Sequence, residues 1–198
     1  MNFKNLLLKL VPLLLLTISL QAQTKSNLEV FYSLLDSSIY EIKNMLAEKS
    51  EISNLQINLG KEYSIFHNYL ISGLSREGII INRNSESAPE LSYVIETSNV
   101  EYDNMERRGL FGDYFVTRKI IVEGNYLIYP GEFGIKRFSF NQIDSVDVSE
   151  IQKLENSSYP FTQGELPAEP FFPGLIEPII AVGTAAIAII LFFTVRSK

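Results

Sequence analysis

The sequence predicts an α+β domain in which two amphipathic helices cover one face of a mostly antiparallel sheet. A cleavable signal peptide precedes this domain, and one C-terminal transmembrane helix follows it. Apolar residues recur at helical spacing over residues 27–48 and 65–74, and they alternate at strand spacing over residues 91–102 and 114–129. With 46% hydrophobic residues and no cysteine in 198 residues, an apolar core must hold the domain together without disulfide bonds.

The start of the chain has the pattern of a secretory signal peptide. Lys4 and Lys9 flank the beginning of an apolar run over residues 6–20, and Ala22 offers a small residue for cleavage. An uncleaved anchor is the alternative, although Lys9 interrupts the run. We therefore expect residues 1–22 to be removed and the mature chain to begin outside the cytoplasm.

A second apolar run, over residues 175–195, predicts a transmembrane helix. At about 1.5 Å per residue it spans about 31 Å, which matches a hydrocarbon core of about 30 Å. Glu177 is its one charge and lies in the first turn. Arg196 and Lys198 follow the run and favour a cytoplasmic C-terminus. The predicted location is the inner (cytoplasmic) membrane, crossed once, with the N-terminal domain outside.

These signals divide the chain into five parts. They are a signal peptide (1–22), an extracytoplasmic domain (23–155), a proline-rich tether (156–173), a transmembrane helix (174–195) and a cytoplasmic tail (196–198). The tether holds half of the 8 prolines of the chain, and such composition favours extended structure.

The predicted domain begins with a helix over residues 27–48. Ser26 and Glu29 have the spacing of a capping box, and the apolar residues after them repeat on one stripe that we expect to face the core. That stripe consists of Leu28, Phe31, Leu34, Leu35, Ile39, Ile42, Met45 and Leu46. A helix that docks a partner is the alternative, because the segment abuts the predicted cleavage site. The second helix, over residues 65–74, is expected to end at Gly78 in a left-handed conformation.

The remaining domain has strand patterning. Strands are predicted at residues 55–59, 79–81, 91–102, 114–129 and 133–140, with polar loops at 82–90 and 104–113, a turn at 130–131 and a short helix at 144–155. The apolar strand at 79–81 is expected to be buried. The apolar residues change parity near residues 97–99, which predicts a bulge. One face of the fourth strand is expected to carry Tyr114, Val116, Ile120, Val122, Tyr126 and Ile128.

Catalytic residue types are scarce. His67 is the one histidine, and we expect it to be solvated, so that no metal or cofactor is expected. Two carboxylate pairs, Glu101 with Asp103 and Asp144 with Asp147, are expected to lie at solvated edges. A carboxylate-dependent hydrolase that acts on envelope material remains the alternative, and it requires these carboxylates to converge in a cleft. The protein is expected not to be an enzyme.

Two clusters are candidates for contact sites. Arg107 and Arg108, in the predicted loop at 104–113, could bind an anionic headgroup or a carboxylate of a partner, with local ion pairing as the alternative. In the apolar run, small residues form one stripe where a second membrane helix could approach closely, which predicts homo-oligomers or a membrane partner. This stripe consists of Ala181, Thr184, Ala185 and Ala188.

The formal net charge of −6 argues against nucleic acid as a partner. A weak similarity to the sorting signal of sortase substrates begins at Leu166, but Glu169 and Pro170 stand where those proteins have the Thr and Gly of the cleaved bond. Because of the similarity that remains, a sortase-processed surface protein is kept as a further alternative.

The order of elements over residues 54–144, with the helix before Gly78 and the meander closed at Pro130, resembles two groups of periplasmic domains. These are domains related to the curli-secretion channel and to the lipoprotein activators of penicillin-binding proteins. The resemblance implies an accessory of envelope assembly or secretion. Because it carries no catalytic set, the chain is expected to be a membrane-anchored binding or scaffold module of the bacterial cell envelope, with the membrane and an envelope protein as partners.

Overall fold

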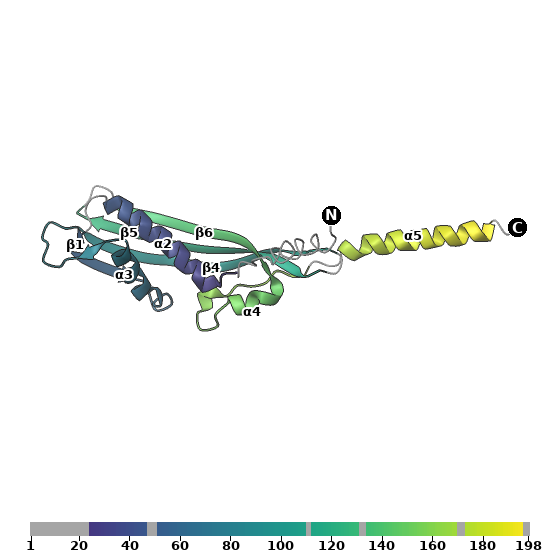
Figure 1. Ribbon diagram of the computed structural model, residues 1–198, viewed down its shortest axis with the longest axis horizontal. Helices are drawn as coiled ribbons and strands as arrows, with labels where there is room; N and C mark the ends of the chain where they lie inside the picture. The colour runs from purple at the N-terminus through teal and green to yellow at the C-terminus, as the bar shows by residue number, and fades with distance from the viewer. Residues whose placement is uncertain (1–23, 47–50, 110–111, 131–133, 170–172, 196–198) are drawn as a thin grey trace, which may run out of the picture.

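The computed structural model describes residues 24–46, 51–109, 112–130, 134–169 and 173–195. An elongated domain occupies most of these residues, and one helix extends away from its end (Figure 1). The predicted signal peptide and the predicted cytoplasmic tail lie outside the described residues.

A four-stranded sheet forms the length of the domain, in the order β2-β4-β5-β6. Its strands are β2 (Asn54–Asn58), β4 (Glu90–Arg107), β5 (Tyr114–Tyr129) and β6 (Ile135–Asp147). The short β2 runs parallel to β4, whereas β4, β5 and β6 are antiparallel neighbours. A second, two-stranded parallel sheet pairs β1 (Glu51–Ile52) with β3 (Ile80–Ile81). The α+β class is confirmed, and the large sheet is mixed.

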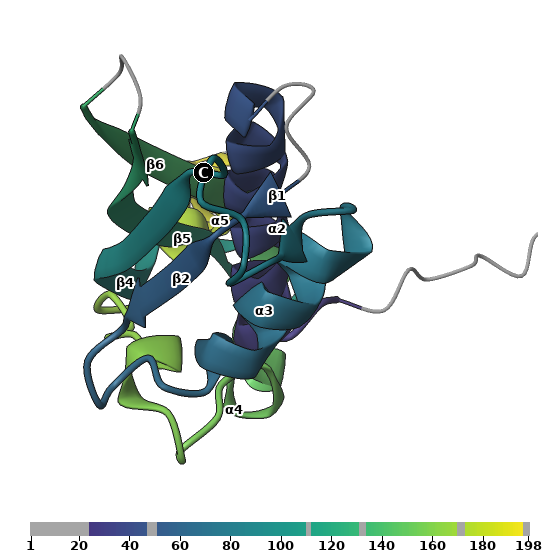
Figure 2. The same cartoon turned by 90° about the vertical axis from the view of Figure 1, so that its left-hand side faces the viewer.

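Two helices, α2 (Asn27–Leu46) and α3 (Phe66–Arg76), lie side by side on one face of the large sheet (Figure 2). The predicted stripe of the first helix faces the core, where Phe31 and Phe66 are completely buried. Gly78 ends the second helix with φ of +84°, a conformation that favours glycine, and this part of the prediction is confirmed.

The predicted change of parity in β4 is a bulge. Leu91, Tyr93 and Ile95 are buried, and after a register shift between Ile95 and Thr97 the even-numbered Val100 and Tyr102 are buried instead. The extra residue therefore keeps an apolar side on the core from Leu91 to Tyr102.

Several predicted boundaries are wrong. Ile80 and Ile81 are exposed rather than buried, because only the preceding Ile79 packs on the core. Residues 104–107 of the predicted loop at 104–113 are strand, since β4 continues to Arg107 through a second register shift. β6 extends to Asp147, so that only η1 (Val148–Glu150) and α4 (Ile151–Leu154) remain of the predicted helix at 144–155.

The first half of the expected tether belongs to the domain. A turn of 3-10 helix, η2 (Pro160–Thr162), buries Phe161 and Thr162. The Phe161 ring packs against the rings of Phe31 and Phe66, with centroids 5.3 and 5.2 Å apart. Aromatic burial of this kind continues the core past residue 155, and residues 163–169 have no regular secondary structure.

The last helix, α5 (Pro173–Val195), extends beyond the end of the domain near which α2 begins (Figure 1). Its side chains from Ile179 to Thr194 are exposed. Among the described residues, no helix combines the length and the apolarity that a membrane crossing requires, so the prediction of a transmembrane helix at 174–195 has no support there.

Candidate functional site

A buried arginine is the centre of the most extensive polar cluster. The alternation of β5 places Arg118 on the helix-covered face, between Val116 and Ile120, and its exposed fraction is 1%. A guanidinium cannot lose its charge in such a place, so its N–H groups must find partners within the fold.

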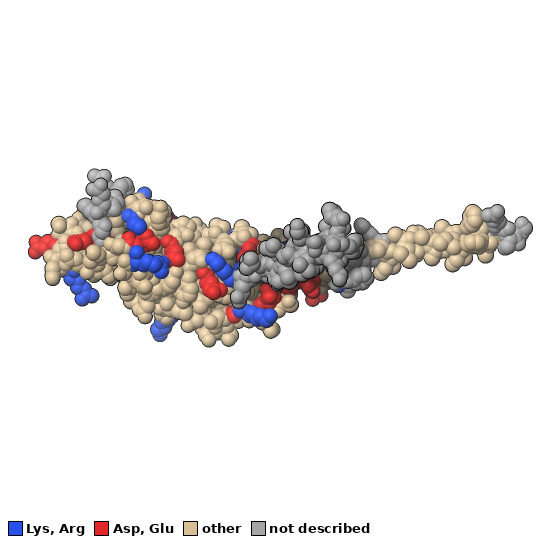
Figure 3. All heavy atoms as spheres, in the orientation of Figure 1, with Lys and Arg blue, Asp and Glu red and all other residues tan. Residues whose placement is uncertain are grey.

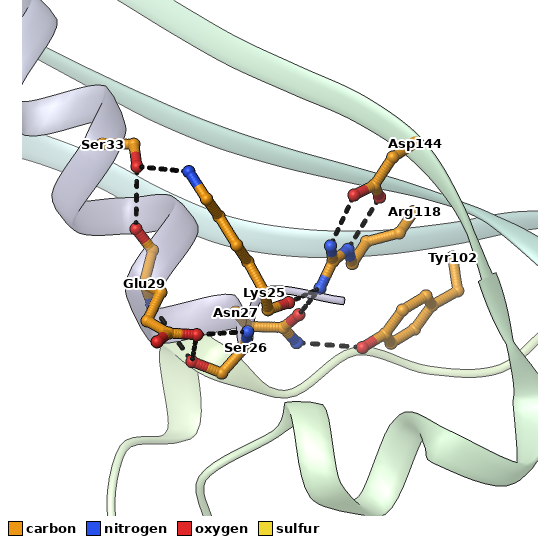
Figure 4. A network of polar contacts seen from close by, with 8 residues as sticks. All are labelled: Lys25, Ser26, Asn27, Glu29, Ser33, Tyr102, Arg118 and Asp144. Atoms are coloured by element: carbon orange, nitrogen blue, oxygen red, sulfur yellow. Dashed lines mark hydrogen bonds and ion pairs between the residues drawn. The ribbon is translucent and has the colours of Figure 1, made fainter. Parts of the chain in front are cut away.

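Asp144 of β6 supplies the opposite charge. The Nε of Arg118 donates to Oδ1 at 2.8 Å, and Nη2 donates to Oδ2 at 2.5 Å, so that the two planar groups meet in a bidentate pair (Figure 4). The aspartate side chain is 33% exposed. The pair therefore lies at the border of the core, with the arginine inside and the carboxylate reaching water.

The third nitrogen of the guanidinium binds the start of α2. Nη1 donates to the carbonyl oxygen of Lys25 and to Oδ1 of Asn27, both at 2.8 Å. The buried Asn27 amide then donates to the hydroxyl of Tyr102 at 2.9 Å and to the carbonyl oxygen of Thr162 at 2.7 Å. We name this cluster the arginine clamp. It consists of Arg118, Asp144, Asn27 and Tyr102 with the carbonyl groups of Lys25 and Thr162.

The clamp joins segments that are far apart in the sequence. Residues 25 and 162 lie close to the two ends of the folded domain, and each gives a carbonyl group to the same network. Buried hydrogen bonds to a charged group are among the stronger ones in proteins. The entry and the exit of the chain are therefore fixed to each other and to the middle of the sheet.

The predicted capping box holds the helix start beside the clamp. The backbone N–H of Ser26 donates to Oε2 of Glu29 at 2.7 Å, and the N–H of Glu29 donates to Oγ of Ser26 at 3.3 Å. The first of these hydrogen bonds holds the pKa of Glu29 below its usual value. This reciprocal cap is confirmed, and it positions Asn27 for the clamp.

Tyr102 closes the clamp from β4. Burial raises the pKa of its phenol to about 12, although the hydrogen bond from Asn27 opposes that change. The hydroxyl is therefore neutral over the ordinary pH range, where it accepts the Asn27 amide without a second buried charge.

The two arginines predicted as a contact site lie elsewhere, at the β4–β5 hairpin. Arg107 donates from Nε to the carbonyl oxygen of Gly112 at 3.0 Å, and its guanidinium lies 5.3 Å from the centroid of the Tyr114 ring. The Arg108 guanidinium lies 3.7 Å from the Phe115 centroid. Both residues are exposed, and each guanidinium lies against one of the two aromatic side chains at the start of β5.

The carboxylates of the two predicted pairs do not converge in one site. Glu101 faces Lys119 at 3.4 Å on the open face of the sheet, whereas Asp144 binds Arg118 on the helix-covered face. His67 is exposed and lies 3.4 Å from the side-chain oxygen of Asn68. Within the described ranges, no group of three histidine, aspartate or glutamate residues could hold a metal ion.

The described helices and strands leave parts of the sheet uncovered. Figure 2 shows no helix on the face opposite to α2 and α3. The strand β6 has a ladder on one side, to β5, and no strand of the described residues pairs with its other side. Charged side chains of both signs are spread over the domain, whereas the outer half of α5 shows none (Figure 3).

Comparison with known proteins gives no family. No protein family and no curated protein sequence matches this chain. Among solved structures, the chain is similar to the rare lipoprotein B from Shewanella oneidensis, with 15% identity over 48% of this chain and 68% of that one, and a TM-score of 0.32. The resemblance predicted from the order of elements named other families of lipoproteins, and it stays a prediction.

Proposed function

We propose that this protein is a binding or scaffold module that α5 attaches to a membrane, with the α+β domain held outside the cytoplasm. The observation that carries the proposal is the surface of α5. Bulky apolar side chains are 57–70% exposed on all its sides, whereas most bulky apolar side chains of the domain lie in one core. These side chains are Ile179, Ile180, Val182, Ile187, Ile189, Ile190, Leu191, Phe192 and Phe193.

An apolar surface on every side is costly in water, at about 25 cal/mol for each Å² that stays exposed. An amphipathic helix could cover such residues by turning one face to the domain, but α5 has no polar face and extends away from the sheet (Figure 1). Lipid covers all sides of a helix at once. A membrane is therefore the environment that fits this surface best.

The arginine clamp suits a module held by one end. Force applied through α5 reaches the domain at Thr162, which hydrogen-bonds to Asn27 and through it to Arg118 in the middle of the sheet. The load is thereby distributed over several hydrogen bonds at the ends of different segments.

Flotation with liposomes tests the proposal. The mature chain from Gln23, reconstituted into liposomes from detergent, is expected to float with the lipid and to stay there after extraction at high pH. A matched chain that ends at Glu169 and lacks α5 is expected to remain in the dense fraction, and it should still unfold cooperatively in urea, which shows that the α+β domain is folded. Equal distribution of the two chains between lipid and buffer would disprove attachment through α5.

A further inference from the structure

The edge of β6 that no strand of the described residues covers is long and regular. All 13 residues from Ile135 to Asp147 belong to the strand, and its register with β5 continues without a shift, whereas β4 contains two shifts. Natural edge strands are usually short, bulged or covered, because an open row of N–H and C=O groups invites another strand. At the opposite edge, β2 has 5 residues and pairs only with residues 90–94 of β4. Beyond β2 the edge is formed by residues 95–107 of β4, which contain both register shifts.

The charges of β6 are separated along its length. Lys136 and Arg137 lie at its start, and Asp144 and Asp147 lie near its end. A second strand of this same sequence in the antiparallel direction brings the basic end of each strand to the acidic end of the other. Opposite charges on facing or diagonal positions stabilise a strand pair, and a parallel arrangement would place like charges together.

A hollow in the surface next to β6 would also lie at the contact between two copies. It lies along α2, and its lining includes Tyr40 and Asn44 of α2, Arg76 and Glu77 at the end of α3, and Phe140 of β6. The Tyr40 side chain is 59% exposed. In a dimer related by a two-fold axis across β6, each copy presents its Tyr40 and Phe140 to the same side chains of the other.

We infer that two copies of this chain associate by antiparallel pairing of their β6 strands, centred near Asn141, to form one continuous eight-stranded sheet. At about 3.4 Å per residue, the paired strands have a length of about 44 Å. Asn141 of one copy lies opposite Asn141 of the other, and Arg137 lies within diagonal reach of Asp147. The two α5 helices then leave the dimer at opposite ends, so pairing through β6 and contact through α5 join different pairs of copies.

Single cysteines test the pairing sharply, because the chain contains none of its own. Asn141→Cys in the mature full chain, in mild detergent, is expected to cross-link to itself with a short bismaleimide. Ile135→Cys is the matched control on the same strand and face. Two Ile135 residues of an antiparallel pair are about 41 Å apart, so no cross-link is expected. Gln56→Cys, on the opposite edge strand, is the second control.

Charge variants supply an independent measurement. Arg137→Glu is expected to weaken the dimer about tenfold in sedimentation, since each dimer loses two favourable contacts and gains two repulsive ones. Arg83→Glu makes the same change of net charge on an exposed residue outside the large sheet and should leave the dimer unchanged. A monomer at 100 μM, or cross-linking of Ile135→Cys or Gln56→Cys as efficient as that of Asn141→Cys, would overturn the inference.

This inference does not depend on attachment to a membrane, because pairing is measured in detergent. If the chain pairs but does not float with liposomes, only the proposed attachment fails. If it floats but Asn141→Cys does not cross-link, only the pairing fails.

Discussion

Arg118 and Asp144 face each other on adjacent strands at the helix-covered side of the sheet, joined by hydrogen bonds of 2.8 and 2.5 Å. Their burial is unequal, with side chains 1% and 33% exposed. If the pair is broken, water can hydrogen-bond to the aspartate in place of the arginine, but water cannot reach the arginine. The cost of breaking the pair therefore depends on which residue is removed.

Arg118→Met should destabilise the domain by about 3–5 kcal/mol, because a buried pair that loses one member leaves polar groups without partners. The carbonyl oxygen of Lys25 and Oδ1 of Asn27 lose their donor in this variant. Urea unfolding followed by circular dichroism measures the change. Lys119→Met, on the next residue and the opposite face, is the control and should cost less than about 1 kcal/mol. Similar losses for both variants would show that the clamp contributes no stability of its own.

The folded domain should require the segment after residue 155. A chain of residues 24–164 should unfold cooperatively, and one of residues 24–155 should be less stable by at least the 3–5 kcal/mol typical of losing a buried aromatic side chain. The second chain lacks Phe161 and the Thr162 carbonyl that binds Asn27. Phe161→Ala in the longer chain separates the aromatic contribution from the remainder. Equal stability of the two chains would show that the domain ends at residue 155.

Tyr102 should make the domain sensitive to alkali. Its pKa in the folded chain is about 12, against 10 for an ordinary tyrosine. The stability linked to this group is thus fully present below pH 10 and is lost as the pH rises from 10 to 12. Tyr102→Phe should be less stable at pH 7, because Asn27 loses an acceptor, yet it should lose less stability between pH 10 and 12.

The measurement is urea unfolding at several pH values. The control is Tyr129→Phe, since that side chain is 65% exposed and should leave the slope unchanged. Tyr93 and Tyr126, whose pKa values are also raised by burial, keep some alkaline sensitivity in every variant. Identical slopes for Tyr102→Phe and the parent chain would contradict the assignment.

Local patterns were enough to predict most elements of the fold. The stripe of α2, the bulge in β4, the full extent of β5 and the left-handed Gly78 each depend on a few neighbouring residues, and the structure confirms them. The ends of β4 and β6 were missed because their outer residues are polar. Ladder hydrogen bonds to β5 hold these residues in strands, and periodicity alone does not reveal that pairing.

The clamp was missed for a different reason. Arg118 occupies an even position in a strand whose other even positions are apolar, and this signal was present in the sequence. Its partners Asn27, Asp144 and Thr162 come from distant segments, so no local spacing could group them. A charged residue in phase with a buried face is a reason to search for a buried partner.

The last prediction concerns the small residues of α5, whose role stays a prediction. Ala181, Thr184, Ala185 and Ala188 are exposed, and the Thr184 hydroxyl donates within the helix to the carbonyl oxygens of Ile180 and Ala181. The stripe is therefore narrow and has no unmet hydrogen bond. Replacing Ala181 and Ala185 together by Leu should prevent close approach of a second helix and weaken association about tenfold, the equivalent of about 1.4 kcal/mol.

Energy transfer between labelled chains in liposomes, at a fixed ratio of protein to lipid, measures this association. Both chains carry Arg137→Glu, so that contact through β6 does not contribute. Ala186→Leu is the matched control, because it adds the same bulk to α5 about 140° away from the stripe and should change nothing. If Ala186→Leu weakens energy transfer as much as the double variant does, added side-chain volume on any side of α5 has the same effect, and the stripe is not a contact site.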